Sequence, residues 1–443
     1  MSASILDNTR ERTLSNGLKV ICCRKTSAPV VSAQVWYRTG SAHERDGIRG
    51  ISHILEHMMF RGSKNIASEE HAQRINDVGG HCNAFTAEDV CAYLNCVPRN
   101  YLDMVFEMES DRMRGLALDP ATLETERKVI IEEYHTYMNN PVAKAFLEFR
   151  RDFFDGHPYA VSPLGQLSDI QSVTQDDCRD YFRKHYHPEN AVILVVGDFD
   201  SEEKVFEKAG KWFGDIDVPP DVPPAAVPPV PSSATGESRR GEWMKRIVEF
   251  DVPMLILGYP APESAAQDAL PLDILQMIIS QGESSRLHRE VVRRQSVAVM
   301  TGGMNHFLKL CGMSLFFAAF TPDINVRRVW KALEKEISTV RDRGITTSEM
   351  TKIRNTTLTH RALEMYSAEH ICQRLGFSET VEGDHRLWIE RMQALEKLDR
   401  DRVIEVARKY WDPRKSHALF LKPKRTKPLL FIMGLARRIV PRS

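Results

Sequence analysis

The sequence has no excess of charge of either sign and no long hydrophobic run. Its 443 residues include 60 Lys and Arg and 60 Asp and Glu, so the formal net charge is zero. A balanced charge gives no general attraction to nucleic acid or to an anionic membrane, although local patches are compatible with it. We therefore expect no nucleic acid among the partners.

Signals for membrane insertion and for export are also missing. No segment reaches the ~18–20 consecutive apolar residues of a membrane-spanning helix, and the first 20 residues lack the apolar stretch of a signal peptide. A cytoplasmic location is the resulting expectation. The eight cysteines are accordingly expected as free thiols, since disulfides are rare inside cells. Cys82, Cys91 and Cys96 contain no Cys-x-x-Cys pair and fall on predicted strands, which favours core positions over a second metal site.

The clearest boundary in the chain is a proline-rich segment at residues 215–242. It contains seven prolines, which exclude a helix or a central strand because proline lacks a backbone donor. We predict an extended linker here. It divides the chain into a first domain at residues 1–214 and a second at residues 243–443, each of a size typical of folded domains.

The two parts show the same order of predicted elements. In the first part we expect a hairpin of strands at 18–25 and 30–40, helices at 51–60 and 69–78, strands at 81–86 and 91–97, helices at 101–114 and 120–138, and a buried strand at 191–199. In the second part we expect a strand pair within 246–260, helices at 270–280 and 284–294, strands at 297–307 and 313–320, helices at 325–343 and 348–364, and a strand from residue 417. The predicted fold is α+β, with two similar α/β domains from an internal duplication, each a mixed sheet with helices on one face.

One pentapeptide carries the clearest chemical signal. His53-Ile54-Leu55-Glu56-His57 lies in the predicted helix at 51–60. Two imidazoles four positions apart share a helix face and can bind one metal ion, and Glu56 is close enough to act as a base toward a metal-activated water. The alternative is that two of the fifteen histidines fall on a core helix by accident. A catalytic zinc site also needs a third protein ligand.

The motif resembles the His-x-x-Glu-His signature of the inverzincin peptidases, the family of pitrilysin, insulin-degrading enzyme and mitochondrial processing peptidase. The third ligand of that family is a Glu on a distant helix, and residues 126–133 resemble this helix. Glu133 lies 76 residues after His57, which is the separation that the family leads us to expect. The resemblance implies Zn²⁺ held by His53, His57 and Glu133, with Glu126 two helical turns earlier orienting the site. Without the motif, such an acidic group is more often a solvated helix face.

Residues 79–93, GGHCNAFTAEDVCAY, resemble the family's Gly-x-x-Asn-Ala-x-Thr segment. In the family this segment is an edge strand beside the metal, to which a substrate peptide can add by β-augmentation. Asn83 and Ala84 are thereby implied as substrate-binding residues. The alternative is an ordinary strand and turn.

The resemblance covers nearly the whole chain, but one position pair departs from it. Members that are catalytically complete in one chain usually carry an Arg and a Tyr, which help to hold the substrate and the developing oxyanion, in the region that resembles residues 282–299. Val292 and Val299 stand at these positions, and valine donates no side-chain hydrogen bond. A displaced alignment, or replacement by Arg293, Arg294 or His306, is the alternative.

We therefore expect a zinc-dependent endopeptidase that cleaves extended peptides or unfolded segments. The missing pair favours the metal-bearing subunit of a heterodimer whose homologous partner supplies Arg and Tyr. Two other interpretations stay open: a non-hydrolytic binding or assembly subunit, and a peptidase that matures a cofactor precursor peptide. The tail from Pro423 combines an apolar run at 429–433 with several basic residues, so it could contact a membrane surface or a partner, although a packed final element is the commoner outcome.

Overall fold

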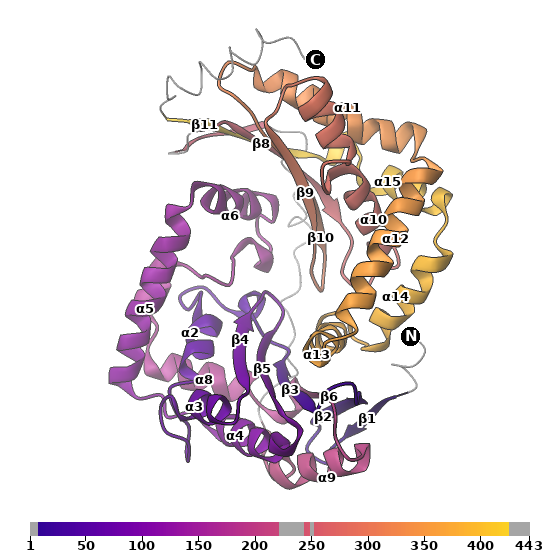
Figure 1. Ribbon diagram of the computed structural model, residues 1–443. Coiled ribbons are helices and arrows are strands. Elements are labelled where there is room, and N and C mark those ends of the chain that lie inside the picture. The colour runs from indigo at the N-terminus through magenta and orange to yellow at the C-terminus, as the bar shows by residue number, and fades with distance from the viewer. Residues whose placement is uncertain (1–7, 221–242, 249–251, 425–443) are drawn as a thin grey trace. The chain divides into compact units, whose positions relative to one another are not determined.

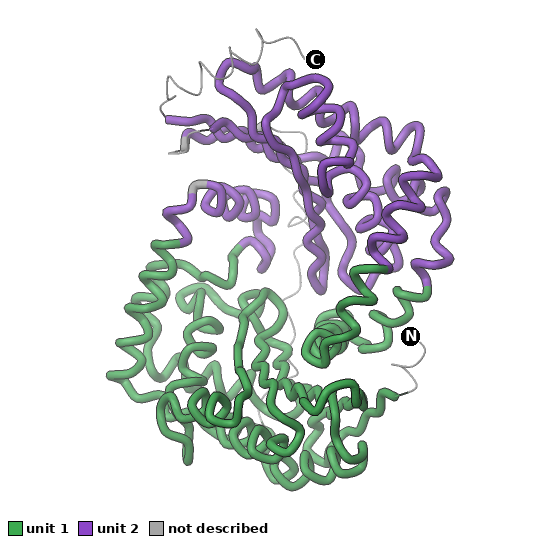
Figure 2. Tube along the Cα trace, in the orientation of Figure 1, with its two compact units in different colours: residues 1–136, 161–230, 359–393 green, residues 137–160, 231–358, 394–443 purple. Residues whose placement is uncertain are grey.

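The computed structural model describes residues 8–220, 243–248 and 252–424 (Figure 1). The chain forms two compact units (Figure 2): unit 1 comprises residues 1–136, 161–230 and 359–393, and unit 2 comprises residues 137–160, 231–358 and 394–443. Neither unit is continuous in sequence. Of the predicted linker at 215–242, only residues 215–220 are described, and the tail after residue 424 lies outside the described residues.

Unit 1 contains a six-stranded sheet with the order β1-β2-β6-β3-β5-β4. Its strands are β1 (Thr9–Thr13), β2 (Lys19–Arg24), β3 (Val30–Tyr37), β4 (His81–Thr86), β5 (Cys91–Pro98) and β6 (Ala191–Gly197). β2 and β6 are parallel, and every other neighbouring pair is antiparallel. The predicted hairpin of β2 and β3 is wrong, because β6 lies between these two strands and pairs with both. The uninterrupted apolar run of β6 suits this central position, where both faces are buried.

Unit 2 repeats this topology. Its strands are β7 (Trp243–Val248), β8 (Met254–Ala261), β9 (Met300–Phe307), β10 (Gly312–Ala319) and β11 (His417–Pro423), in the order β7-β11-β8-β10-β9. This order matches β2-β6-β3-β5-β4 of unit 1, and the parallel pair stands at the same place, β7 with β11. The predicted duplication is therefore confirmed at the level of topology. The predicted strand pair within 246–260 is wrong for the same reason as the hairpin, since β11 separates β7 from β8.

Helices cover both faces of each sheet, not one face as predicted. On β2, Val20 and Cys22 join one apolar cluster while Ile21 and Cys23 join another, because alternate side chains of a strand point to opposite faces. The first face of the unit 1 sheet carries α2 (Ile51–Met58), α4 (Leu102–Arg114), α8 (Gln175–His185) and α9 (Glu202–Phe213). The second face carries α13 (Ala368–Phe377) and α14 (Arg386–Lys397), which come from the other half of the sequence.

The exchange of helices between the halves is reciprocal. In unit 1, Gly376 of α13 lies against Trp36 of β3, so closely that an added Cβ would stand 2.3 Å from the indole. In unit 2, Phe149 of α6 (Pro141–Phe153) lies against Gly258 of β8, where an added Cβ would stand 2.6 Å from the phenyl ring. Glycine permits both close approaches because it has no side chain. Each half thus supplies a helix that covers the sheet of the other half.

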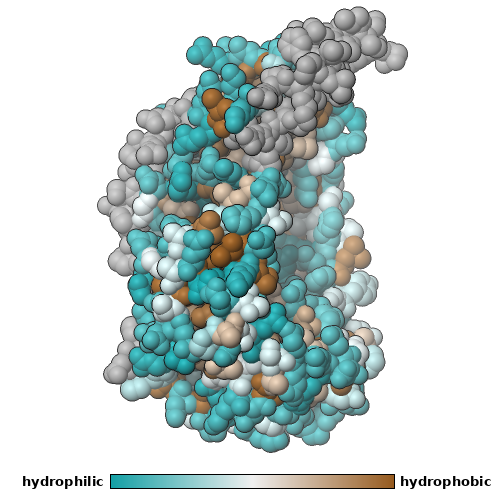
Figure 3. Space-filling view, turned by 90° about the vertical axis from the view of Figure 1, so that its left-hand side faces the viewer, coloured by the Kyte–Doolittle hydropathy of each residue, from teal (hydrophilic) through white to brown (hydrophobic). Residues whose placement is uncertain are grey.

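The remaining helices lie close to their predicted positions or were not predicted. They are α3 (Glu70–Asp77), α5 (Pro120–Asn139), α7 (Leu167–Ser172), α10 (Ala269–Ser280), α11 (Val326–Arg343), α12 (Thr347–Glu364) and α15 (Arg400–Tyr410). The predicted helix at 284–294 is a π-helix at His288–Arg294. In the described part of the chain, no helix has both the length and the apolar composition needed to cross a membrane. On the face shown in Figure 3, hydrophobic side chains form small groups among hydrophilic ones.

A buried charged network joins three elements of unit 1. Arg112 and Glu109 of α4 are 2% and 1% exposed, and Arg112 Nε donates to Glu109 Oε2 at 2.7 Å. Asn95 of β5 donates to the same carboxylate at 2.6 Å and also contacts His71 of α3 at 3.0 Å. Burial raises the pKa of Glu109 and, together with the charge of Arg112, lowers the pKa of His71 to about 3. The guanidinium carbon of Arg112 lies 4.4 Å from the centre of the Tyr93 ring.

We expect the substitution Arg112→Met to lower the free energy of unfolding by about 3–5 kcal/mol, because it leaves the Glu109 carboxylate buried without its cation. Urea unfolding followed by circular dichroism measures this change. Arg114→Met, two positions along the same helix, is the control: its ion-pair partner Asp215 has a side chain that is 73% exposed, so we expect a loss below about 1 kcal/mol. Equal losses in the two variants would contradict the importance of the buried pair.

Candidate metal centre

Helix α2 has an apolar and a polar side. Its buried core residues are Ile51, Ile54, Leu55 and Met58. His53 and His57 project from another side, with side chains 18% and 19% exposed. Their ring centroids are 4.9 Å apart and the ring planes are nearly perpendicular, at 85°. The helical repeat therefore separates the residues that hold α2 in the core from those that can act as ligands.

Helix α5 brings two carboxylates to the histidines. It begins with Pro120, and Asp119 accepts the backbone N–H of Thr122 at 2.8 Å, which is a favourable start for a helix. Leu123, Glu126 and Ile130 form its buried stripe. Glu133 is the next position of this stripe, since the spacing of three and four residues follows one helix face.

The three predicted ligands lie together. Glu133 Oε2 is 3.7 Å from His53 Nε2 and 3.6 Å from His57 Nε2. Two ligands about 2.1 Å from a zinc ion, at a tetrahedral angle, stand about 3.4 Å apart, so the spacing suits zinc. Two imidazoles and one carboxylate are also a donor set that catalytic zinc sites use. Burial and the neighbouring His57 lower the pKa of His53 to about 4, which keeps its imidazole neutral, as metal binding requires.

Glu126 contacts the far side of the His57 ring, at Nδ1, and not the three atoms that could hold the metal. Its Oε2 is 3.1 Å from His57 Nδ1, and its other oxygen is 2.8 Å from Arg61 Nε. A carboxylate at Nδ1 fixes the imidazole tautomer that leaves Nε2 available to a metal. Glu126 is therefore placed where it could orient His57, as the sequence predicts. For His53, no described residue hydrogen-bonds Nδ1.

Arg61 was missed by the sequence analysis. It lies four residues after His57, forms an ion pair with Glu126 and another with Glu69, and so holds the carboxylate that orients His57. Its sequence position carries no specific signal, because an arginine just after a helix is common.

Glu56 is held beside the two histidines by a threonine. Thr86 Oγ1, at the end of β4, donates to Glu56 Oε2 at 2.6 Å. Burial raises the pKa of Glu56, which favours proton uptake by this carboxylate. Thr86 was not singled out from the sequence, although it is the threonine of the Gly-x-x-Asn-Ala-x-Thr segment and the signal was present.

Strand β4 is the edge of the unit 1 sheet next to α2. It pairs only with β5 among the described strands, so its other edge can accept a further strand. Asn83 is exposed, and Ala84 packs partly against the core. Asn83 Oδ1 accepts the backbone N–H of Ala84 at 2.9 Å. A peptide that added at this point would compete with the Asn83 side chain for that N–H group.

A second group of three possible ligands occurs in unit 1, formed by Glu11, Glu379 and His385. Cations already neutralise its carboxylates. Lys19 Nζ is 2.8 Å from Glu11 and 3.0 Å from Glu379, and two guanidinium groups, of Arg38 and Arg386, lie within 3.2 Å and 3.1 Å of the same two carboxylates. This is an ion-pair network whose positive charge disfavours a metal ion.

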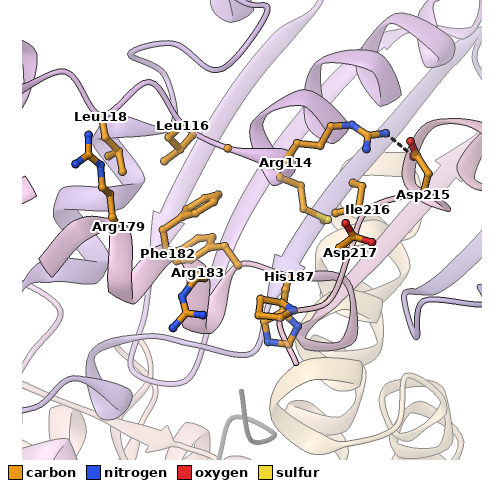
Figure 4. A pocket seen from close by; sticks show the side chains of 14 residues that line it. Arg114, Leu116, Leu118, Arg179, Phe182, Arg183, His187, Asp215, Ile216 and Asp217 are labelled. Atoms are coloured by element: carbon orange, nitrogen blue, oxygen red, sulfur yellow. Dashed lines mark hydrogen bonds and ion pairs between the residues drawn. The ribbon is translucent and has the colours of Figure 1, made fainter. Parts of the chain in front are cut away.

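A cavity of about 420 Å³ lies elsewhere in unit 1 (Figure 4). α8 and residues 215–219 contribute to its lining, and its Arg114 is paired with Asp215 at 2.6 Å. None of the predicted site residues lines it. The candidate metal centre is therefore separate from this cavity.

Val292 and Val299, which stand where the family usually has Arg and Tyr, lie in unit 2. Val292 belongs to the π-helix and packs partly against the core of unit 2, and the N–H of Val299 donates to Ala319 O at 2.8 Å. Of the alternative donors, Arg293 is paired with Glu283 at 2.5 Å and Arg294 with Glu290 at 2.8 Å, while His306 lies on β9. Both arginines are thus already engaged within unit 2.

Comparison with known proteins identifies similar chains. Residues 19–165 match the family model described as "Insulinase (Peptidase family M16)", and residues 172–357 match "Peptidase M16 inactive domain". The zinc protease PqqE of Helicobacter pylori is 27% identical over 425 residues, which are 95% of this chain and 94% of the relative. A protein of Arabidopsis thaliana named "Probable mitochondrial-processing peptidase subunit beta, mitochondrial" is 23% identical over 91% of this chain and 76% of its own length.

Solved structures share the fold over nearly the whole chain. A protease from Helicobacter pylori superposes with a TM-score of 0.87 at 27% identity, over 94% of this chain and 99% of the other. A structure described as a peptidase M16 inactive domain from Pseudomonas fluorescens gives a TM-score of 0.83 at 15% identity, over 95% and 99% of the two chains. The second similarity concerns the fold alone.

Proposed function

The chain belongs to the insulinase family of peptidases, M16, and from this premise we propose that it is a zinc-dependent endopeptidase for extended peptides or unfolded segments. The observation that carries the proposal is the convergence of His53, His57 and Glu133 within 4.8 Å of one another. Glu56 lies on the same helix as the two imidazoles. The names of the relatives, which include several zinc proteases, support the same chemistry.

The residues of the chain divide the work of hydrolysis. A zinc ion in the site would act as a Lewis acid on the scissile carbonyl and lower the pKa of a water molecule. Glu56 accepts a proton from the attacking water on its carboxylate and returns it to the leaving amine nitrogen, while Thr86 holds one of its oxygens. Glu126 keeps His57 in the tautomer that exposes Nε2. The free edge of β4 aligns the substrate backbone beside α2, with Asn83 and Ala84 at the point of addition.

We further propose that this chain is the metal-bearing subunit of a heterodimer. Val292 and Val299 carry no side-chain hydrogen-bond donor at the positions that resemble the family's Arg and Tyr, so a homologous partner would provide this pair. The match of residues 172–357 to a family model described as an inactive domain is compatible with a partner that supplies part of the active site. It is equally compatible with a non-hydrolytic binding or assembly subunit. A peptidase that matures a cofactor precursor would use the same chemistry on another substrate.

We expect the purified chain, loaded with one equivalent of zinc, to cleave quenched fluorescent peptides slowly on its own. Addition of a homologous protein isolated by co-purification with this chain should raise kcat by about 10²–10³-fold, the effect of restoring an oxyanion donor. The control is the same mixture with Glu56→Gln in this chain, which should be inactive and so assign the metal chemistry to this subunit. Full activity of the pure chain would overturn the heterodimer. A metal-free, inactive chain that still binds the co-purifying protein would instead support the binding subunit.

A further inference from the structure

Helix α2 begins at a residue that cannot cap it. Its N-cap is Gly50, with a left-handed φ of 105° and no side chain, so the first backbone N–H groups need an acceptor from elsewhere. Glu44 provides it. Oε2 of Glu44 accepts the N–H of Gly50 at 2.7 Å, and Oε1 accepts the N–H of Ser52 at 3.0 Å. The next residue after Ser52 is His53, so one carboxylate holds the turn from which the first ligand projects.

The surroundings of Gly50 explain why the acceptor comes from outside the helix. A Cβ at Gly50 would stand 3.0 Å from the Ile170 side chain and 3.3 Å from Gly165 Cα. A Ser, Thr or Asp cap would therefore press on both neighbours, and its backbone would be strained at a φ of 105°. The left-handed backbone and the close packing at Gly50 thus both favour glycine over a residue with a capping side chain.

The charge of Glu44 has no cation in contact with it. The residue is 3% exposed, and no ion pair within 4.0 Å is formed with it in the described part of the chain. The charge of Arg49 lowers the pKa of Glu44, but the Arg49 guanidinium is itself paired with Asp46 at 3.1 Å. Burial raises the pKa of Glu44 to about 7, although both backbone N–H groups act in the opposite direction. The position of this carboxylate at the N-terminal end of α2 is also favourable for its negative charge.

A chain of hydroxyl groups holds the same turn from a second side. Ser52 Oγ is 3.0 Å from Tyr181 OH, and Tyr181 OH is 3.0 Å from Thr39 Oγ1. All three residues are buried. Ser52 is therefore tied through its N–H to Glu44 and through its hydroxyl to α8.

We propose that Glu44 is a positioning residue for the metal centre: its carboxylate locks the first turn of α2 and so sets the placement of His53 and His57 for metal binding. The core residues of α2 fix its axis, but its first turn has no intrahelical acceptor for these N–H groups. Loss of the acceptor would let this turn fray, and the imidazole of His53 would move with it. The effect on activity rests on the proposed peptidase function, whereas the effect on metal affinity does not.

Glu44→Gln tests the inference with an isosteric change. Its amide can accept one of the two N–H groups but not both, and it carries no charge. We expect the zinc dissociation constant, measured by chelator competition, to rise about 10–100-fold, as for other residues that orient a ligand. We expect kcat to fall in parallel and KM to stay unchanged, because β4 is untouched. Hydrogen exchange of the peptide that spans residues 48–58 should become faster.

The matched control is Asp169→Asn. Asp169 Oδ2 accepts the N–H groups of Gly47 and Arg49, at 2.9 Å and 3.0 Å, so it holds the same loop but no part of α2. Its zinc affinity should equal that of the wild type. If Glu44→Gln does not fold, Glu44→Asp takes its place: the charge is kept, but the shorter side chain cannot span both N–H groups, and a rise of the dissociation constant is again expected.

A folded variant whose zinc affinity and kcat lie within twofold of the wild type would overturn the role of Glu44. The failure of the proposed function looks different. In that case the wild type binds zinc but cleaves no peptide, and the comparison of dissociation constants still decides whether Glu44 positions the ligands.

Discussion

Replacing Glu56 by Gln is expected to abolish peptide cleavage while zinc stays bound. Gln keeps the size of the side chain, and its amide oxygen can still accept the hydroxyl of Thr86, which donates at 2.6 Å in the structure. It cannot take a proton from water. Loss of a general base costs about 10²–10⁴-fold, so we expect kcat to fall by that factor with KM little changed. Initial rates of cleavage of quenched fluorescent peptides measure kcat and KM. Elemental analysis of the same samples measures the zinc content.

Glu132→Gln is the control for this experiment. Glu132 is an exposed residue of α5, and its substitution makes the same chemical change close to the site without touching the two histidines. Its kcat should equal that of the wild type. Retention of more than about a hundredth of the activity by Glu56→Gln would contradict the role of Glu56, since a general base contributes at least about 10²-fold.

Replacing Glu133 by Gln is expected to remove the metal. The variant loses the anionic ligand whose oxygen stands 3.7 Å and 3.6 Å from the two imidazole nitrogens, and a neutral amide is a poor zinc ligand. We expect the zinc content after dialysis to fall from about one per chain to near zero. Peptide cleavage should be lost with it. Elemental analysis and the peptide assay measure the two effects.

Thermal unfolding gives an independent measure of the same site. Zinc at 100 times its dissociation constant should stabilise the wild type by about 2.7 kcal/mol and a chelator should reverse the effect, because only the folded chain presents the assembled ligands. Glu133→Gln should show no such response, and the adjacent Glu132→Gln should respond like the wild type. A Glu133→Gln variant that retains stoichiometric zinc would exclude Glu133 as a ligand.

The wrong strand pairings and the unexpected helix placements share one physical cause. β2 and β3 have the local pattern of paired strands and are close in sequence, so a hairpin was the natural prediction. Their actual partner, β6, follows more than 150 residues later, and strand alternation carries no information about which strand is the neighbour. The same holds for β7 and β8, which β11 separates. The exchange of helices between the halves was not predictable for a similar reason. The apolar stripe of a helix shows which side is buried, but not which sheet it packs against.

Local geometry let the sequence by itself determine much of the candidate site. A spacing of four residues puts His53 and His57 on one helix face wherever the helix lies, and a spacing of seven does the same for Glu126 and Glu133. The resemblance to a known family predicted that these two helices meet at one metal site. The roles of these residues in metal binding stay predictions that the variants above can test.

Only the tertiary structure decided which other groups complete the site. Thr86 of β4 contacts Glu56. Arg61, which follows α2, contacts Glu126 of α5. Glu44 contacts the first turn of α2 from the loop before that helix. No periodicity links these residues to their partners. Their contacts depend on how helices and strands pack around a common core, and this packing is set by burial of apolar side chains over the whole unit. The sequence by itself therefore predicted the candidate metal ligands. The tertiary structure decided which further residues hold those ligands in place.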